Sequence, residues 1–369
     1  MTSNRKQLTV KYKGRDVGTL ALAKTGQVAF QYTKDWLKDG FSISPFSLPL
    51  SEDVFVHTAL NMDGLFGVFY DSLPDAWGKL VVDRTLSKSG MDVKQLNVLD
   101  RLAIVGANGM GALEYYPQYN YVSNTNSLTI DQLAEECNNI INSITTDNLD
   151  ELFKVAGSSG GARPKAFVRI EDEEWLIKFQ YSLDKENSGL REFQYSYFAR
   201  ECGISMSETK LFPSNNSSGY FGTKRFDRPK IHMVSAAGLL EADFNNSVCD
   251  YKDLLKLTNI ITNGNTEEIK EMYTRMCFNV VFHNQDDHLK NFAYLYDEKY
   301  DKWHISPAYD LTDAATAFGE HTTTVNGKGK NILDEDLISV GIKSGLGKDF
   351  CKEKLMQVKE VYFHKTGKG

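Results

Sequence analysis

The sequence lacks the features of membrane, secreted and nucleic-acid-coating proteins. No uncharged apolar run approaches the roughly 18 residues that span a bilayer, and the N-terminus, MTSNRKQLTVKYKGRDVG, has no apolar stretch that could serve as a signal peptide. Basic residues are in deficit, because the formal net charge is -7, whereas binding along nucleic acid needs a surplus of Lys and Arg. We therefore expect a soluble protein that has no membrane contact and reaches DNA only indirectly.

Paired cysteines are also missing. The five cysteines are widely spaced and form no C-x-x-C motif that would indicate a zinc site or a redox centre. Isolated cysteines of this kind fit a reducing compartment, so we expect a cytoplasmic location. The chain of 369 residues, 41% of them hydrophobic, can bury a sizeable core without disulfides and is long enough for roughly two or three domains.

The N-terminal third carries strand patterns followed by helical ones. Residues 6–35 alternate apolar and polar side chains, which predicts a small antiparallel sheet. From 61 to 100 the apolar spacing becomes helical, and 106–117 is typical of a Gly-rich turn that leads into a strand. We expect residues 1–118 to form an N-terminal subdomain.

The rest of the chain divides into a linker, a β-rich region and a helical region. Residues 119–149 begin with a polar linker and end with a predicted helix from Ile130 to about Ile144. Residues 150–238 combine a Gly-rich loop with strand patterns, and residues 239–369 are mostly helical. The patterns together predict an α+β fold with a β-rich N-terminal subdomain and a mostly helical C-terminal lobe.

The densest group of chemical side chains is HNQDDHLKNF (283–292), which lies between a predicted helix and an apolar strand. Within it Asp286 and Asn291 have the D-x-x-x-x-N spacing of phosphotransferase catalytic loops. In that chemistry the carboxylate accepts the proton of the attacking hydroxyl, and the amide oxygen ligates Mg²⁺. A second carboxylate should then follow on the next hairpin, and the predicted strand 303–309 ends at Asp310.

Such a site also needs a cation and a loop for the phosphates. Lys178 lies in an apolar strand, where its ammonium must either reach solvent or meet an anion. Upstream, Gly157, Gly160 and Gly161 could let backbone N–H groups approach phosphate oxygens, and Lys165 adds charge. The loop matches neither GxxxxGK[ST] nor GxGxxG, so taken alone it is a weak signal.

Each feature also has an ordinary structural explanation. Asp286 and Asp287 could cap or solvate a turn, and Asp310 could be the N-cap of a helix that follows it. Glu192, at the start of a helix, could pair with Lys178, or could face solvent or the helix dipole. The rival enzyme class is a metal-dependent phosphohydrolase. Its ligands would be His283, Asp286, Asp287 and His288.

Motifs spread over nearly the whole chain resemble one family. In the first third they are FSISPFSLPL, FYDSLPDAWG and VGANGMGALEYYP, followed in order by GSSGGARPKAF, WLIKF, EFQYSYFARECGI, TKRFDR, NQDDHLKNF and SPAYDLT. This set resembles the HipA toxins, the kinase components of bacterial type II toxin–antitoxin modules. The resemblance implies a bilobal, protein-kinase-like fold, in which 150–238 is the N-lobe-like region and 239–369 is the C-lobe.

The resemblance also implies a role for each site residue. Asp286 is the catalytic base, Lys178, Asn291 and Asp310 complete the catalytic set, and Asn291 and Asp310 bind Mg²⁺. The residues expected to contact ATP are Gly157, Ser158, Ser159, Gly160, Gly161, Ala162, Arg163, Lys165, Lys178, His288, Lys290, Asn291, Tyr309 and Asp310. Ser158 is the first candidate for autophosphorylation and Ser159 the second, a modification that in such proteins displaces the loop and ends ATP binding.

The implied partners are proteins. One is a small helix-turn-helix antitoxin (HipB-like), through which the complex reaches operator DNA, and the other is a protein substrate of the translation machinery, such as an aminoacyl-tRNA synthetase. The implied outcome is growth arrest and persistence. Two alternatives stay open: a small-molecule kinase on the same scaffold, and a catalytically inactive co-repressor that binds the antitoxin.

Overall fold

The computed structural model describes residues 5–59, 61–119, 128–181, 187–242, 249–316 and 318–367. Most of the predicted linker, 120–127, lies outside the described residues. The chain forms two units, each of which is described by itself. Unit 1 comprises Met1–Gly189, Leu211–Val234 and Gly238–Glu241, and unit 2 comprises Leu190–Lys210, Ser235–Ala237 and Ala242–Gly369. The finer four-part division predicted from the sequence stays a prediction.

Unit 1 begins with the predicted antiparallel sheet. Its strands are β1 (Gln7–Tyr12), β2 (Arg15–Leu22), β3 (Val28–Tyr32), β4 (Phe55–Val56) and β5 (Leu113–Tyr116), in the order β4-β3-β2-β1-β5. Lys13 and Gly14 both have positive φ, as a two-residue hairpin turn requires, and this turn sets the register of β1 against β2. The prediction for 6–35 is confirmed.

The helices of unit 1 coincide only in part with the predicted helical stretches, since no helix was predicted over 36–39 or 149–156. They are α1 (Trp36–Asp39), α2 (Gly67–Tyr70), α3 (Ala76–Lys88), α4 (Val98–Val105), α5 (Ile130–Ile141) and α6 (Leu149–Ala156), with 3-10 turns η1 (Met62–Gly64) and η2 (Val93–Gln95). The start of α5 follows from a capping box, in which Thr129 and Gln132 each accept a bond from the other's backbone N–H. That helix ends at Ile141, three residues before the predicted end.

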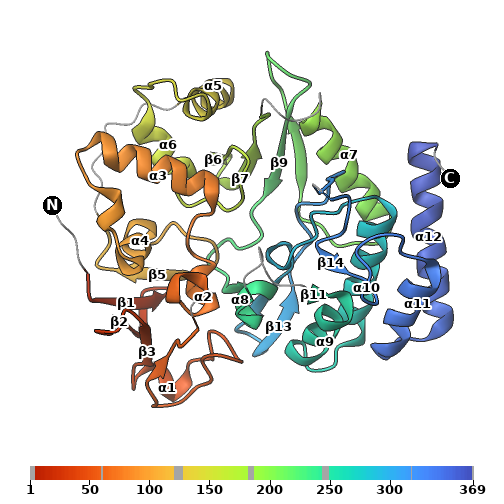
Figure 1. Cartoon of the computed structure of the whole chain (residues 1–369), viewed down its shortest axis with the longest axis horizontal. Coiled ribbons are helices and arrows are strands. Elements are labelled where there is room, and N and C mark those ends of the chain that lie inside the picture. Colours follow the sequence, from red (N-terminus) through yellow and green to blue (C-terminus); the bar gives the residue numbers. More distant parts are fainter. Residues whose placement is uncertain are drawn as a thin grey trace. The chain divides into compact units, whose positions relative to one another are not determined.

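A second sheet of unit 1 shares its core with helices from the first half of the chain. It contains β6 (Lys165–Ile170), β7 (Glu173–Lys178), β9 (Tyr220–Lys224) and β8 (Thr209–Phe212), in the order β6-β7-β9-β8, with β8 starting in unit 2. Trp77 of α3, Leu152 of α6 and Ile177 of β7 are buried in one apolar cluster. Figure 1 shows α3 and α6 side by side next to β6 and β7. The first part of the chain therefore helps to build the core under the Gly-rich loop.

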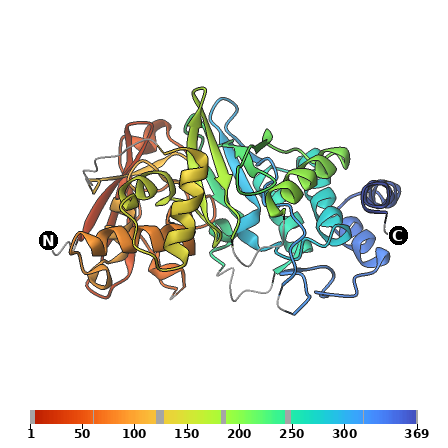
Figure 2. The same cartoon turned by 90° about the horizontal axis from the view of Figure 1, so that it is seen from above.

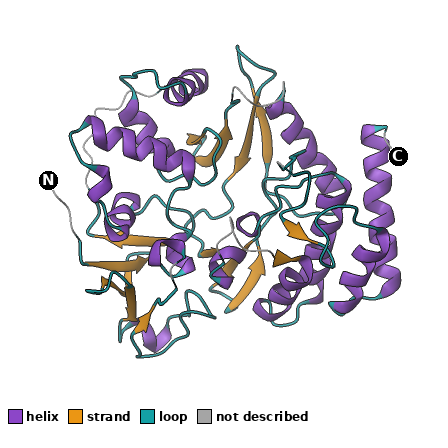
Figure 3. Ribbon diagram, in the orientation of Figure 1, coloured by secondary structure: helices purple, strands orange, loops and turns teal. Residues whose placement is uncertain are grey.

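Unit 2 is mainly helical (Figure 3). Its helices are α7 (Ser188–Glu201), which starts at the end of unit 1, α9 (Tyr251–Ile261), α10 (Thr266–Val281), α11 (Asp334–Lys343) and α12 (Lys348–Thr366), and the 3-10 turn η3 (Leu289–Asn291). Packing is centred on α10, which contacts α9, α11 and α12, the last seen end-on in Figure 2. Stacked rings of Phe278 and Phe282 end α10, with centroids 4.2 Å apart.

Short strands complete unit 2 and position its loops. β11 (Cys249–Asp250) pairs in parallel with β14 (Thr323–Thr324), and β12 (Ala293–Asp297) pairs antiparallel with β13 (Lys302–Ile305). β10 (Met233–Ser235) and α8 (Ala236–Leu240) each contain residues of both units. None of the described helices is both long and apolar enough to span a membrane. All five cysteines are buried and unpaired.

Candidate functional site

The segment that follows α10 carries the predicted base. The side chain of Asp286 is 60% exposed, and its Oδ1 lies 3.8 Å from Nε2 of His288. Asn291 closes the loop, because its Nδ2 donates a hydrogen bond of 2.7 Å to the carbonyl oxygen of Asp286. This bond uses the amide nitrogen, so Oδ1 is the atom with which Asn291 could ligate a cation. The two predicted residues are thus held together by a direct contact.

Asp287, next to the exposed carboxylate, is completely buried and holds the segment in place. Its Oδ2 accepts hydrogen bonds from the Tyr251 hydroxyl at 2.8 Å and from Nδ1 of His321 at 2.9 Å, and its Oδ1 accepts one from the backbone N–H of Thr323 at 3.1 Å. Burial, together with the charge of Asp287, raises the pKa of Tyr251 well above its usual value, so the phenol stays a donor. The sequence analysis did not assign this anchoring role to Asp287. A signal was available, because adjacent side chains of an extended segment point to opposite sides, so one of Asp286 and Asp287 should face inward.

The segment that contains Asp310 runs alongside this loop. Nδ2 of Asn284 donates to the carbonyl oxygen of Asp310 at 3.4 Å, and the Tyr309 hydroxyl donates to the carbonyl oxygen of Lys290 at 2.6 Å. Asp310 has a φ of +54°. Aspartate adopts this left-handed conformation more readily than most residues other than glycine. Asp286, Asn291 and Asp310 therefore lie on adjoining segments of unit 2.

Two predictions about this segment are wrong. The strand expected over 303–309 ends at Ile305, because Pro307 has no N–H with which to continue the ladder. The alternative role of Asp310 as a helix N-cap also fails, since the described residues 311–316 form no helix.

In unit 1, two lysines occupy paired positions of the second sheet. Lys165 at the start of β6 lies directly opposite Lys178 at the end of β7. Nζ of Lys178 is 5.8 Å from the ring centre of Phe221, and Lys165 is buried. Directly opposite residues of neighbouring strands share one face of a sheet, so the two lysines are suited to contact one anion.

The Gly-rich loop enters this sheet from α6. Ser159 is fully buried, and its hydroxyl donates to the carbonyl oxygen of Ala156 at 2.7 Å, whereas Ser158 is partly exposed. Gly161 has a φ of +79°, which a side chain would disfavour. The two candidate phosphorylation sites are therefore not equivalent, because only Ser158 presents surface to a phosphoryl donor.

The predicted residues fall into two groups. Those of the loop 157–165 and Lys178 belong to unit 1, and those from His288 to Asp310, with Asp286, belong to unit 2. Glu192, for which pairing with Lys178 was one of the alternatives, is buried in α7 of unit 2 and does not face solvent. Convergence of the two groups around one nucleotide stays a prediction.

The donors at Asn291 and Asp310 suit a hard cation. An amide oxygen and a carboxylate are the ligand types that Mg²⁺ takes, usually with water and phosphate oxygens. Clusters of three or more His, Cys, Asp or Glu side chains able to hold a metal are absent from the part of the chain that the structure describes. This disfavours the rival phosphohydrolase, whose site would have needed His283, Asp286, Asp287 and His288 to form such a cluster.

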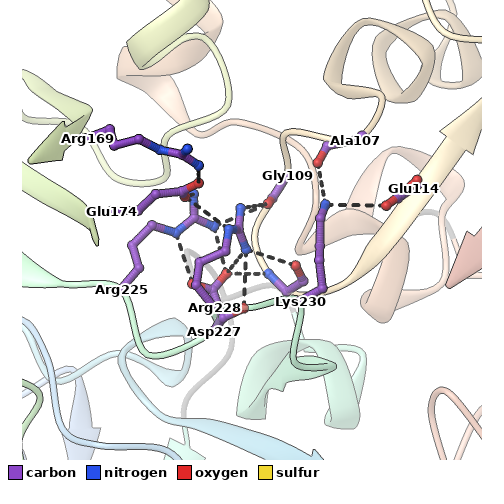
Figure 4. A network of polar contacts seen from close by, with 10 residues as sticks. Ala107, Gly109, Glu114, Arg169, Glu174, Arg225, Asp227, Arg228 and Lys230 are labelled. Carbon is purple, nitrogen blue, oxygen red and sulfur yellow. Dashed lines mark hydrogen bonds and ion pairs between the residues drawn. The ribbon is translucent and has the colours of Figure 1, made fainter. Parts of the chain in front are cut away.

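A buried network of charges ties two distant parts of unit 1 together (Figure 4). The carboxylate of Asp227 accepts hydrogen bonds from Arg225 at 2.7 and 2.9 Å, from Arg228 at 2.9 Å and from the backbone N–H of Gly111 at 2.7 Å. Burial acts to raise the pKa of Asp227, but the two guanidinium groups and the Gly111 amide outweigh it and lower that pKa. Glu174 contacts both arginines, at 3.3 and 3.0 Å.

Comparison with known proteins assigns the chain to a family. Residues 8–116 match the model of the HipA N-terminal domain, and residues 157–362 match that of the HipA-like C-terminal domain. The chain belongs to the HipA family. Among solved structures, the HipA protein of Shewanella oneidensis, determined with HipB and operator DNA, has a TM-score of 0.72 at 18% identity. The alignment covers 97% of this chain and 89% of that one, so the two share a fold, and the predicted α+β fold is confirmed.

Two further proteins match a smaller part of the chain. Y4dM of Sinorhizobium fredii, named as a candidate kinase, is 28% identical over 172 residues, which are 41% of this chain and 40% of that protein's length. The Helicobacter pylori kinase CtkA aligns with a TM-score of 0.38 at 14% identity, over 55% of this chain and 90% of its own. An alignment this loose does not by itself establish a shared fold.

Proposed function

We propose that the chain is an ATP- and Mg²⁺-dependent Ser/Thr protein kinase and the toxin of a type II toxin–antitoxin module. The observation that carries the proposal is the arrangement in unit 2. The backbone carbonyl of the exposed Asp286 accepts a bond from Asn291, and the neighbouring Asp287 is buried. The segment that contains Asp310 runs alongside, bonded at Asn284 and Lys290. Few other chemistries need an accessible carboxylate next to an amide and a second carboxylate on adjoining segments.

In this proposal Asp286 orients the attacking hydroxyl and accepts its proton. The hydroxyl oxygen then bonds to the γ-phosphorus of ATP while the bond from that phosphorus to the bridging oxygen of ADP breaks. Asn291 and Asp310 would hold Mg²⁺, which neutralises charge on the phosphates. His288, Lys290 and Tyr309 belong to the same two segments and complete the C-lobe side of the site.

The unit 1 residues would bind the nucleotide phosphates. Lys165 and Lys178 would attract the negative charge as a cross-strand pair. In the loop from Gly157 to Arg163, the N–H groups of Gly157, Ser159 and Gly161 are bonded within the chain, so phosphate contacts would come from the other backbone N–H groups. The hydroxyl of Ser158 is the proposed site of autophosphorylation, and Ser159 comes second because it is buried.

The partners are also proposed. The Shewanella oneidensis structure contains HipB and operator DNA, and we propose that this chain binds a comparable helix-turn-helix antitoxin and reaches DNA through it. The phosphorylated target would be a protein of the translation machinery, such as an aminoacyl-tRNA synthetase, and its modification in the cytoplasm would arrest growth.

Intact-mass spectrometry of the full chain after incubation with ATP and Mg²⁺ tests the proposal. We expect addition of one phosphoryl group to the wild type and none to Asp286→Asn. Asp349→Asn, an exposed aspartate on α12 of the same unit, is the matched control and should be phosphorylated like the wild type. ATP binding without any transfer to protein would instead support a small-molecule kinase or an inactive co-repressor.

A further inference from the structure

The N-terminus of α3 holds the Gly-rich loop by hydrogen bonds to one residue. Oδ2 of Asp75 accepts a bond of 2.8 Å from the backbone N–H of Gly161, and the backbone N–H of Trp77 donates one of 3.2 Å to the carbonyl oxygen of Gly161. Both polar backbone groups of Gly161 are therefore bound to a helix that lies more than 70 residues earlier in the chain. All of these residues belong to unit 1.

Asp75 does not do what its position in the sequence predicts. It is the N-cap residue of α3, where an aspartate normally accepts a bond from the first turn of its own helix. Here its side chain makes no capping bond. Its carboxylate faces the loop instead, and a Cβ added to Gly160 would lie 3.3 Å from the same Oδ2. The Asp75 side chain therefore bonds to the loop and does not cap its own helix.

Trp77 extends the contact to the first residue of β6. Its indole Nε1 donates a bond of 2.9 Å to the carbonyl oxygen of Lys165, and its ring is only 2% exposed, packed in the core with Leu152 and Ile177. Because Lys165 pairs with Lys178 of the neighbouring strand, this bond also holds the backbone of β6 at the position of the lysine pair.

Gly78 lets the helix approach the loop closely. A Cβ at this position would lie 2.7 Å from the carbonyl oxygen of Ser159 and 3.1 Å from that of Ala156. Both are backbone atoms, which cannot move aside without shifting the loop. Three residues thus fit α3 to the loop: Asp75 by its carboxylate, Trp77 by its indole, and Gly78 because it has no side chain.

We infer that Asp75 and Trp77 are positioning residues, by which the HipA N-terminal domain holds the Gly-rich loop in the conformation that binds ATP. That the loop binds ATP rests on the proposed function. That Asp75 and Trp77 anchor the loop does not. With Gly161 held at both its N–H and its carbonyl, the loop keeps Ser159 buried and Ser158 partly exposed.

Hydrogen exchange and steady-state kinetics on the full chain test this together. In Asp75→Ala we expect exchange at the Gly161 amide to rise about tenfold, while amides of β7 keep their protection. We expect KM for ATP to rise about tenfold, the loss expected for one charge-assisted hydrogen bond, with kcat within about twofold of the wild type. Asp75→Asn keeps an acceptor oxygen, so the exchange rate at Gly161 and the KM for ATP should both stay close to those of the wild type. Trp77→Phe should raise both quantities, but by less than Asp75→Ala does.

Asp92→Ala is the matched control, because the Asp92 carboxylate accepts bonds from Lys94 N–H and Gln95 within its own turn. It should change neither readout. Unaltered exchange over 157–164 in Asp75→Ala would overturn the anchoring. Faster exchange with an unchanged or lower KM would overturn the positioning role and indicate that the carboxylate competes with phosphate. If the wild type neither binds nor uses ATP while Asp75→Ala still loosens the loop, the proposed function fails and the anchoring stands.

Discussion

Replacing Asp227 by Asn tests the charged network of Figure 4 most sharply. The substitution keeps the size of the side chain but removes the charge shared by Arg225 and Arg228, and it turns an NH₂ group toward their donors. Removing one partner of a buried ion pair costs about 3–5 kcal/mol. Glu174 still contacts both guanidinium groups, and Arg228 is 17% exposed, so part of the loss is offset. We expect the free energy of unfolding to fall by about 2–4 kcal/mol, a large share of a typical domain's stability.

The effect should depend on pH in a defined direction. The pKa of Asp227 is lowered from an ordinary value of 3.8, so the unfolded chain binds its proton first as the pH falls. The stability that the carboxylate contributes is then complete above about pH 4 and is lost below it, as the pH falls through the folded pKa. The difference between wild type and Asp227→Asn should therefore be largest near neutral pH and shrink in acid.

Urea unfolding followed by tryptophan fluorescence measures this difference. Trp36, Trp77 and Trp175, three of the four tryptophans, lie in unit 1, so the signal reports on the unit that contains the network. Asp16→Asn is the control, because its pair with Lys11 is on the surface and should be worth nothing measurable. A loss below about 1 kcal/mol in Asp227→Asn, or a loss that grows in acid, would refute the reasoning.

Four further substitutions test the sites. Asp287→Asn should lower the free energy of unfolding by about 2–4 kcal/mol and also slow phosphoryl transfer, whereas Tyr251→Phe removes one donor and should cost only about 1 kcal/mol; equal losses would contradict the network. Gly78→Ala should destabilise the chain by about 1–3 kcal/mol despite the better helix propensity of Ala, and a more stable variant in thermal melts would be inconsistent with the close approach to the loop. Peptide mass spectrometry should find phosphate on Ser158 in both wild type and Ser159→Ala, and loss of the phosphate from Ser159→Ala would show that the buried serine is the target.

The sequence predicted features that depend on local pattern. The sheet over 6–35 was predicted from alternation, and the helix from Ile130 from its local sequence pattern. The structure adds the turn at Lys13 and Gly14 and the capping box at Thr129. The D-x-x-x-x-N loop was found because its residues are close in sequence, and the structure joins Asp286 and Asn291 by a direct hydrogen bond. Interactions between residues that are close in sequence can therefore be predicted from the sequence alone.

What the sequence could not predict depends on partners far along the chain. Asp287 is bound by Tyr251, His321 and Thr323, each more than 30 residues away. Asp75 fits the pattern of an ordinary N-cap, and only the fold reveals that its acceptor is used by Gly161. The early end of β13 was the exception, since Pro307 was visible in the sequence and argued against a strand through it.

The rate of ADP formation by the wild type and by Asp286→Asn at saturating ATP and Mg²⁺ is the most direct measurement. If Asp286 is the base, the variant should bind ATP as tightly as the wild type but form ADP about a thousandfold more slowly. Comparable rates in the two proteins would contradict the assignment of the catalytic loop.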